Sequence, residues 1–251
     1  MSAALCLVDI GNSRIKWARY DGGMLLAGTP FATDVERFAA SLDSLWLGLD
    51  QPSTVYASNV AGPDIAAELQ RWVQDRWGIA VHFARSTARY GHVSSGYTTP
   101  EQLGVDRWLG LLGLHRNHVL PACLVDCGTA LTADLLDADG RHRGGVIAPG
   151  MTSMRRSLHQ DTHALGLVQG PPVAGAFGFD TASGIALGGA LACAGLVEKF
   201  LEASNEALQQ PVRLVMTGGE AALIGRHLSM PYCPDETIVL SGLLTLAESD
   251  L

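Results

Sequence analysis

The sequence predicts an α/β protein made of two similar halves, and two observations support this expectation. Short apolar runs alternate with segments whose apolar residues recur at helical spacing. One strand–turn pattern also occurs twice, as Leu7-Val8-Asp9-Ile10-Gly11-Asn12-Ser13 and Leu124-Val125-Asp126-Cys127-Gly128-Thr129. Each copy delivers a carboxylate, then a glycine that permits close backbone approach, then hydroxyl or amide side chains, a combination that suits phosphate oxygens and a hard cation. We therefore expect one nucleotide to bind between the halves.

The first half is expected to open with three adjoining strands and to continue with alternating helices and strands. Asp34 is a candidate N-cap for the first helix, and a proline occupies the first turn of the second helix. The expected elements are strands at 4–9, Arg14–Tyr20 and Met24–Phe31, a helix at Asp34–Leu49, a strand at Thr54–Ser58, a helix at Pro63–Trp77 and a strand at Ala80–Phe83.

Residues 84–103 show little periodicity, so we expect a long loop that is functional or disordered. A helix is expected after Gly104–Trp108. The second half then repeats the opening, with strands at about 123–127, 131–137 and 143–148, helices near 150–160 and 178–206, a strand at Arg213–Thr217, and helices near 219–228 and 236–249. A boundary near His118–Ala122 gives expected domains of 1–118 and 119–251.

The composition favours a soluble protein that acts on small molecules. Of the 251 residues, 47% are hydrophobic. The chain has 17 Lys and Arg and 25 Asp and Glu, which gives a net charge of −8. Because no basic face is available, a nucleic acid or an anionic membrane is not an expected partner. The five cysteines form no CxxC pair and no basic segment precedes the first apolar run, so we expect reduced cysteines, no signal peptide and a cytoplasmic location.

The segment Thr181–Val197 contains no charged residue and is almost long enough to span a membrane. It also contains four glycines, and charged residues bound it closely on both sides. We therefore favour a buried helix that packs closely against another helix, such as one from a second subunit.

Several side chains are candidates for chemistry, although each has a plain structural alternative. Lys16 could reach a nucleotide phosphate or could lie on the solvated side of a hairpin. Asp106 could accept a proton from a substrate hydroxyl that attacks a γ-phosphate, with Arg107 gripping the substrate, or the pair could be a helix cap and a surface cation. Spacing alone leaves these alternatives open.

Other common motifs are absent from the sequence. GxxxxGK[ST] and GxGxxG do not occur, so any phosphate site is of another type. The histidine pairs His115/His118 and His159/His163 lack the remaining ligands of a zinc pattern, and without a GxSxG motif a serine hydrolase has little support.

The motifs combine into a recognisable set. They are Asp9-Ile10-Gly11-Asn12-Ser13 with Lys16, Tyr97-x-x-Pro100-x-x-Leu103-Gly104-Val105-Asp106-Arg107-Trp108, Asp126-Cys127-Gly128-Thr129-Ala130-x-Thr132, Gly145-x-Ile147-x-Pro149-Gly150, Phe177-Gly178-x-x-Thr181 and Thr217-Gly218-Gly219. Together they resemble type III pantothenate kinases, a branch of the acetate and sugar kinase/Hsp70/actin superfamily, over almost the whole chain. Serine replaces the family's usual threonine at position 13 and keeps a hydroxyl.

The resemblance implies a duplicated ribonuclease H-like (actin-like ATPase) fold, with the active site in the cleft between two similar domains. Asp106 would be the general base, and Asp126 would bind a potassium or ammonium ion. The implied ligands of ATP with Mg²⁺ are Asp9, Ile10, Gly11, Asn12, Ser13, Arg14, Ile15, Lys16 and Thr129. The implied ligands of pantothenate are Tyr97, Gly104, Val105, Asp106, Arg107 and Thr181, the last from the other subunit of a homodimer.

The expected function is therefore ATP-dependent phosphorylation of pantothenate to 4′-phosphopantothenate, the first step of coenzyme A biosynthesis. One alternative is a kinase or phosphatase of the same superfamily that acts on another metabolite. A second is a regulatory or accessory protein that binds nucleotide without turnover. The presence of Asp9, Asp106, Arg107 and Asp126 argues against the second alternative, because a fold kept only for binding does not need the base.

Overall fold

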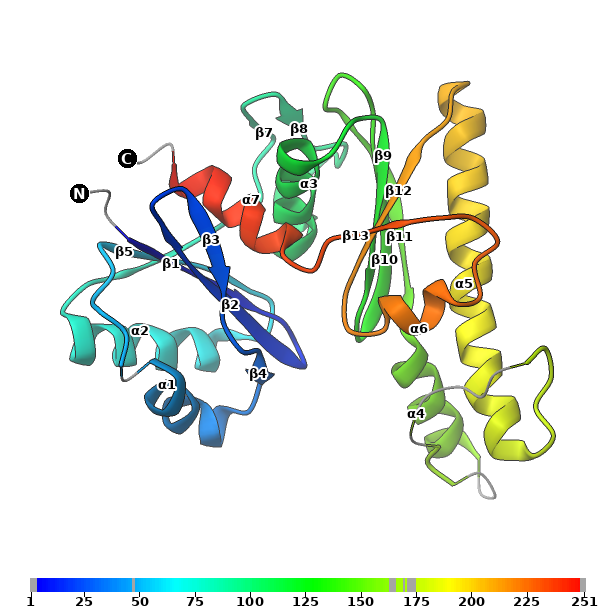
Figure 1. Ribbon diagram of the computed structural model, residues 1–251, viewed down its shortest axis with the longest axis horizontal. Helices are drawn as coiled ribbons and strands as arrows, with labels where there is room; N and C mark the ends of the chain where they lie inside the picture. The colour runs from blue at the N-terminus through cyan, green and yellow to red at the C-terminus, as the bar shows by residue number, and fades with distance from the viewer. Residues whose placement is uncertain (1–3, 47, 163–165, 169, 171–174, 249–251) are drawn as a thin grey trace. The chain divides into compact units, whose positions relative to one another are not determined.

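The computed structural model describes residues 4–46, 48–162, 166–168, 170 and 175–248, and the chain divides into two compact units (Figure 1). The first unit contains Met1–Asn117 together with Thr237–Leu251, and the second contains His118–Glu236. Each unit has its own sheet and its own hydrophobic core.

The first unit is built on a sheet with the strand order β3-β2-β1-β5-β6 and a short strand β4 that pairs with β2. β1 is antiparallel to β2 and parallel to β5, which is parallel to β6. The strands are β1 (Leu5–Ile10), β2 (Arg14–Asp21), β3 (Met24–Ala27), β4 (Phe31–Ala32), β5 (Thr54–Asn59) and β6 (Val81–Phe83).

Helices cover both faces of this sheet (Figure 1). Cys6, Val8 and Ile10 of β1 belong to the core formed with α1 and α2. Because side chains alternate along a strand, Leu5, Leu7 and Asp9 point to the opposite face, where α3 and α7 lie. The helical segments are η1 (Val35–Arg37), α1 (Phe38–Trp46), α2 (Pro63–Trp77), η2 (Pro100–Gln102), α3 (Val105–Asn117) and α7 (Ile238–Ala247).

Several expected elements of this unit differ in the structure. The helix expected after Gly104–Trp108 already begins at Val105, and the one expected at Asp34–Leu49 is divided into η1 and α1, which ends at Trp46. The strand expected at Met24–Phe31 is divided into β3 and β4, and Gly28 between them packs so closely on the ring of Trp17 that a Cβ would overlap it. The loop expected at 84–103 contains a hairpin of β7 (Arg89–Tyr90) and β8 (Val93–Ser94). The Tyr90 hydroxyl donates to the Thr245 carbonyl at 3.0 Å, which ties this hairpin to α7.

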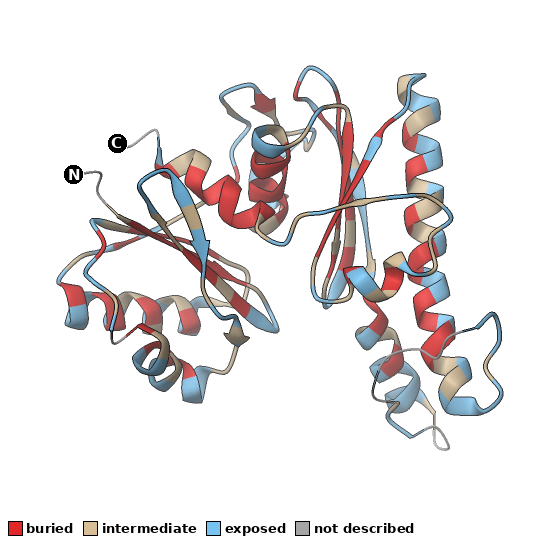
Figure 2. Cartoon of the chain, in the orientation of Figure 1, coloured by how far each residue is buried: buried red, intermediate tan, exposed pale blue. Residues whose placement is uncertain are grey.

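The C-terminal helix α7 belongs to the first unit, so the expected division into 1–118 and 119–251 needs a correction. A Cβ on Gly113 of α3 would lie 2.0 Å from the Ile238 carbonyl oxygen, and one on Gly242 of α7 would lie 2.0 Å from that of Leu109. The two backbones therefore touch through reciprocal glycines, and both helices are largely buried (Figure 2). This contact explains why the chain returns to the first unit after Glu236.

The second unit has the strand order β11-β10-β9-β12-β13. Its strands are β9 (Ala122–Cys127), β10 (Ala130–Leu136), β11 (His142–Pro149), β12 (Arg213–Thr217) and β13 (Cys233–Pro234). Its helices are α4 (Met151–Asp161), α5 (Thr181–Leu208) and α6 (Ala221–Gly225), and all three share one core with β9, β10 and β12.

The two sheets have the same plan. In both, the central strand is antiparallel to the second strand of its unit and parallel to the strand on its other side. β1 and β9 occupy equivalent ranges that are offset by 117 residues, so Asp9 and Asp126 hold equivalent positions. The alternation of side chains along the two strands also agrees. Cys123, Val125 and Cys127 belong to the core of the second unit formed with α4, α5 and α6, as Cys6, Val8 and Ile10 belong to the core formed with α1 and α2. The expected duplication is confirmed.

Helix α5 is long and apolar enough to cross a membrane by length and composition alone. Of its apolar window, 44% is buried in the structure, and the helix packs against α4, α6, β9 and β10 of the second unit. The helix begins with a capping box, in which the Asp180 carboxylate accepts from the Ser183 N–H at 2.7 Å. The five cysteines are free thiols, as expected, and burial raises the pKa of Cys6 to about 12.

Candidate active site

The first strand–turn places a buried carboxylate beside a hydroxyl. Asp9 is 9% exposed and lies opposite Lys16 of β2 and Ser58 of β5. The Ser58 hydroxyl donates to Asp9 Oδ1 at 2.6 Å. Burial raises the pKa of Asp9 above its ordinary value, the Ser58 hydrogen bond and Lys16 oppose this rise, and Asp106 adds to it. Asp9 and Asp106 are therefore close enough to influence each other's charge.

Residues 11–13 form a tight turn whose backbone is fixed from two sides. The Gly11 N–H donates to the Arg14 carbonyl at 3.1 Å. The Thr33 hydroxyl donates to the Gly11 carbonyl at 2.7 Å, and the Thr33 N–H donates to the Ser13 carbonyl at 3.2 Å. Asn12 and Ser13 are exposed, as a nucleotide ligand must be.

The residues of the predicted ATP segment differ in how far their side chains are buried. The side chains of Ile10 and Ile15 are fully buried in the core with α1 and α2, so only their backbone is available to a ligand. Arg14 is exposed, and Lys16 is half-buried on the same face of the sheet as Asp9. This placement favours the phosphate interpretation of Lys16 over a lysine on the solvated side of the hairpin.

Asp106 lies in the first turn of α3. Its Oδ1 accepts from the Arg107 N–H at 2.8 Å, which agrees with the capping alternative. A Cβ on Gly104 would lie 2.6 Å from Asp106 Oδ1. A glycine at 104 thus leaves room for the carboxylate, and the neighbouring Val105 is half-buried at the first position of the helix.

Arg107 is a buried cation, which excludes the simple surface alternative. It is 7% exposed, and its guanidinium donates to the Tyr97 hydroxyl at 2.8 Å. The guanidinium carbon also lies 5.5 Å from the centre of the Tyr97 ring, within the range of a cation–π contact. The structure therefore brings together the predicted substrate residues of the first unit, 97 and 104–107.

The second strand–turn surrounds its carboxylate with different groups. Asp126 is half-buried and lies opposite Thr132 of β10 and Thr217 of β12. Among the described residues, the buried Thr217 hydroxyl has no hydrogen-bond partner. A Cβ on Gly218, which has a φ of +95°, would lie 2.5 Å from Asp126 Oδ1, so the backbone after β12 packs directly on the carboxylate.

Thr129 is exposed in the second turn, and its carbonyl is held by the start of α4. The Gly150 N–H donates to this carbonyl at 3.0 Å, and the Ser153 hydroxyl donates to it at 2.6 Å. A Cβ on Gly150 would lie 2.0 Å from the Gly128 carbonyl oxygen. The conformation of this turn therefore depends on a segment that follows β11.

Thr181, the predicted contribution to a second subunit, is the first residue of α5 and is exposed. It lies in the second unit, as do Asp126 and Thr129, whereas the other predicted site residues lie in the first unit.

The sequence reasoning did not identify Ser58 or Thr33 as parts of the site. Each contacts its strand–turn only through tertiary structure, because 49 residues separate Ser58 from Asp9 and 22 separate Thr33 from Gly11. The available signal for Ser58 was its position at the end of a second parallel strand, where polar side chains of neighbouring strands meet.

The comparisons with known proteins agree with this geometry. A model of the type III pantothenate kinase family matches residues 5–203. The type III pantothenate kinase from Burkholderia lata is 40% identical over 255 residues, which covers 96% of this chain and 94% of that protein. The chain belongs to the type III pantothenate kinase family. It is accordingly a phosphotransferase, and phosphorylation of pantothenate in coenzyme A biosynthesis is confirmed as its function over the accessory-protein and other-metabolite alternatives.

Solved structures confirm the fold class. An ethanolamine utilization protein, EutJ, from Carboxydothermus hydrogenoformans covers 98% of this pantothenate kinase chain with a TM-score of 0.54 at 13% identity, and 90% of EutJ is covered. MreB 5 of Spiroplasma citri, bound to AMPPNP, covers 100% with a TM-score of 0.52 at 11% identity, and 97% of MreB 5 is covered. At such identities the likeness concerns the actin-like fold alone.

Proposed function

We propose that Asp106 is the general base that takes the proton from the primary hydroxyl of pantothenate as this oxygen attacks the γ-phosphate of ATP. The observation that supports this role is the cluster at the start of α3, where Gly104 leaves room for Asp106 and a buried Arg107 is held by Tyr97. A buried guanidinium suits the carboxylate or carbonyl of pantothenate. A carboxylate on a rigid helix suits proton transfer at a fixed position.

ATP would bind through its phosphates to the turn at 11–13, to Lys16 and to the turn around Thr129. Mg²⁺ prefers a few carboxylate oxygens and the oxygens of the substrate phosphates, and Asp9 is a carboxylate at the right end of β1 for this role. The ion would neutralise phosphate charge during transfer. Among the described residues, no group of three or more acidic, histidine or cysteine side chains forms a protein-only metal cage. This donor set fits an ion held jointly with ATP.

Asp126 would bind the activating monovalent cation. The surroundings of its carboxylate fit this role, since two threonines lie opposite it in the sheet. In the part of the chain that the structure describes, the buried Thr217 hydroxyl has no partner, and an oxygen of this kind is available to a hard cation such as K⁺. We expect K⁺ or NH₄⁺ to add affinity for substrates by fixing this strand end.

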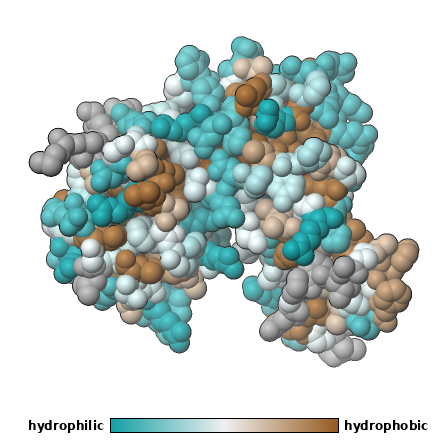
Figure 3. All heavy atoms as spheres, in the orientation of Figure 1, coloured by the Kyte–Doolittle hydropathy of each residue, from teal (hydrophilic) through white to brown (hydrophobic). Residues whose placement is uncertain are grey.

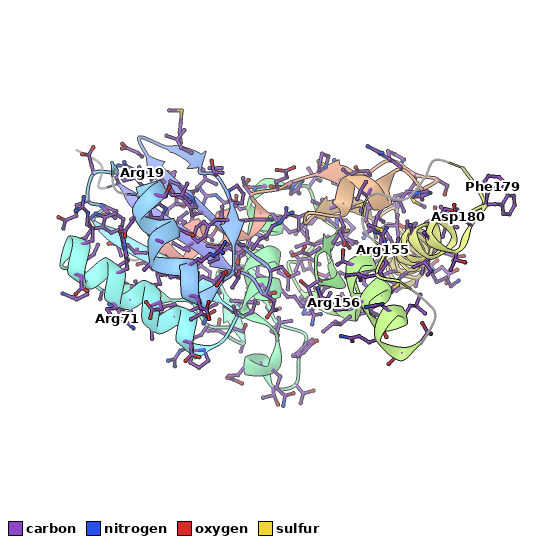
Figure 4. The ribbon with its side chains drawn as sticks, turned by 90° about the horizontal axis from the view of Figure 1, so that it is seen from below. Arg19, Arg71, Arg155, Arg156, Phe179 and Asp180 are labelled. Atoms are coloured by element: carbon purple, nitrogen blue, oxygen red, sulfur yellow. The ribbon has the colours of Figure 1, made fainter. Side chains whose placement is uncertain are left out.

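The protein would act as a cytoplasmic homodimer in which Thr181 reaches pantothenate in the other subunit. Phe177 and Phe179, just before α5, are 74% and 95% exposed, and Phe179 projects away from the unit beside Asp180 (Figure 4). Apolar surface lies at the same end of α5 (Figure 3). Exposed residues of α5 include Gly184 and Gly188, which allow a second helix to approach closely.

A coupled assay with Mg-ATP and pantothenate, run in potassium and in sodium buffers, tests this proposal. We expect 4′-phosphopantothenate to form faster in potassium, and we expect sedimentation to give the mass of a dimer. Thr181→Val should raise the KM for pantothenate without changing the mass. Absence of product in both buffers, while ATP binding is intact, would overturn the proposed reaction.

A further inference from the structure

Glu220 makes contacts that none of the roles above explain. It follows Thr217-Gly218-Gly219 after β12 and precedes α6. Its carboxylate does not cap α6, because the structure shows no side-chain cap at that helix. Instead, the carboxylate contacts the start of α4, where Thr152 lies 68 residues before Glu220 in the sequence.

The carboxylate of Glu220 accepts three hydrogen bonds from α4. The Met151 N–H donates to Oε2 at 3.0 Å, and the Thr152 N–H donates to Oε1 at 3.1 Å. The Thr152 hydroxyl donates to Oε1 at 2.5 Å. A carboxylate on the first N–H groups of a helix is favourable both as a hydrogen-bond acceptor and through the helix dipole.

The same residue is also fixed at its backbone. The Glu220 N–H donates to the Cys127 carbonyl at 3.0 Å, at the end of β9 and next to Asp126 and Gly128. Glu220 therefore joins the end of β9 to the start of α4, and the turn that contains Thr129 lies in the chain directly after β9.

The start of α4 in turn holds that turn from the other side. Gly150 and Ser153 both donate to the Thr129 carbonyl, at 3.0 and 2.6 Å. If α4 shifted, these two bonds and the close contact between Gly150 and the Gly128 carbonyl would change together. The contacts thus form a closed path from Cys127 through Glu220, α4 and Thr129 back to Gly128.

We propose that Glu220 is a positioning residue for ATP, because it anchors α4 and so fixes the turn at 128–130 in the conformation that receives phosphate oxygens. This inference rests on the proposed assignment of Thr129 to ATP. Glu220 itself would not touch the nucleotide phosphates, which its negative charge would repel. Its loss should weaken ATP binding while leaving the pantothenate residues of the first unit unaffected.

Glu220→Gln tests the inference with little change in volume. The amide keeps one acceptor oxygen but turns an NH₂ group toward an N–H donor of α4, so the anchor is broken at one of its two oxygens. We expect the KM for ATP to rise about tenfold, as the loss of a hydrogen bond to a charged group allows. The KM for pantothenate should change less than about twofold. The dissociation constant of Mg-AMPPNP, measured by calorimetry without pantothenate, should rise with the KM for ATP.

Glu198→Gln is a matched control. Glu198 of α5 likewise joins two segments through a backbone N–H and a hydroxyl, because its Oε1 accepts from both groups of Ser229 at 2.7 and 2.8 Å, and Ser229 follows α6 in the chain, away from the turn at 128–130. We expect it to lower thermal stability slightly and to leave the affinity for Mg-AMPPNP unchanged. Should Glu220→Gln fail to fold, Thr152→Val removes a single bond to the same carboxylate, and a smaller rise in the KM for ATP is expected.

Two outcomes would overturn the inference. One is unchanged affinity for Mg-AMPPNP in Glu220→Gln alongside a loss of stability like that of Glu198→Gln, which would make Glu220 a structural cap. The other is an equal rise in both KM values. Calorimetry separates this test from the proposed reaction, because nucleotide binding is measured whether or not pantothenate is the acceptor.

Discussion

The two strand–turns of the molecule share a backbone frame and differ in what surrounds their carboxylates. Asp9 lies between Lys16 and Ser58, and Asp126, at the equivalent position, lies between Thr132 and Thr217. Ser58 donates to Asp9, whereas the hydroxyl of Thr217 has no partner among the described residues. One frame thus offers an ammonium group suited to phosphate, and the other offers oxygens suited to a cation.

The turns also differ in how their backbones are fixed. The first is closed by its own residues and by Thr33, which hydrogen-bonds to the carbonyls of Gly11 and Ser13. The second is also packed closely by the backbones of Gly150 and Gly218, where a Cβ would lie 2.0 Å from the Gly128 carbonyl oxygen and 2.4 Å from the Cys127 carbonyl oxygen. The two frames are therefore similar, and the segments around each one fix its turn in a different way.

The largest expected effect is on the backbone of the second turn. Gly150→Ala places a Cβ 2.0 Å from the Gly128 carbonyl oxygen, so we expect a loss of about 3 kcal/mol in the free energy of unfolding. Gly128→Ala is the control, since its nearest neighbour lies at 3.6 Å and the change should cost less than about 1 kcal/mol. Urea denaturation measures both. Equal losses would show that the glycine of the motif, and not the distant segment, fixes this turn.

Ser58→Ala should have the next largest effect. It leaves the Asp9 carboxylate buried without its 2.6 Å hydrogen bond, so we expect a loss of about 2 kcal/mol in stability and about a tenfold fall in kcat/KM for ATP. Ser53→Ala is the control, because Ser53 donates to the Ala4 carbonyl at the entry to the same strand and is exposed. A normal kcat/KM in Ser58→Ala would remove Ser58 from the site.

Thr217→Val should act in the opposite direction on stability. Replacing a buried hydroxyl that is unpaired among the described residues with a methyl group of similar size is expected to stabilise the protein in sodium buffer by about 1 kcal/mol, or about 2–4 °C in Tm. Any rise in the Tm of the wild type on adding potassium should be lost in the variant. An undiminished potassium effect in Thr217→Val would contradict the assignment of this hydroxyl to the cation site.

Asp9→Asn is expected to give a small, pH-dependent gain in stability without nucleotide. Burial raises the pKa of Asp9 in the folded state, so ionisation opposes folding. This penalty is absent below the ordinary carboxyl pKa of about 4 and grows as the pH rises from there through the raised folded value. The amide oxygen can still accept from Ser58. The urea midpoint of Asp9→Asn should therefore exceed that of the wild type by an amount that grows from about pH 4 to about pH 8. A variant that is less stable than the wild type at the upper end of this range would contradict this prediction.

Much of the fold could be predicted from local patterns. Pro63–Trp77 and Arg213–Thr217 were predicted to the residue, because a proline at the helix start and a bounded apolar run mark those ends clearly. The placement of α7 could not be predicted in the same way. Its packing depends on reciprocal contacts between Gly113 and Gly242, and no local signal pairs two glycines that are so distant in the chain.

The candidate site shows the same division. Asp9, Asp106 and Asp126 stand at ends of predicted elements, where the strand–turn and loop–helix patterns identify them. The hydrogen bonds of Ser58 to Asp9 and of Glu220 to α4 join segments that are distant in the chain, so no local pattern marks these two residues. The buried side chains of Ile10 and Ile15 were predicted as ligands because they lie inside a motif, and only strand alternation assigns them to the core.

The most direct test of the assigned chemistry is the turnover of Asp106→Asn, with Asp64→Asn as its control. Asp64 is also the acidic residue in the first turn of a helix of the same unit, so it shares the electrostatic environment of a helix start without the proposed role. We expect kcat of Asp106→Asn to fall by about 10²–10⁴-fold while Mg-AMPPNP binding is retained, and Asp64→Asn to remain near the wild type. A folded Asp106→Asn protein with wild-type kcat would contradict its assignment as the base.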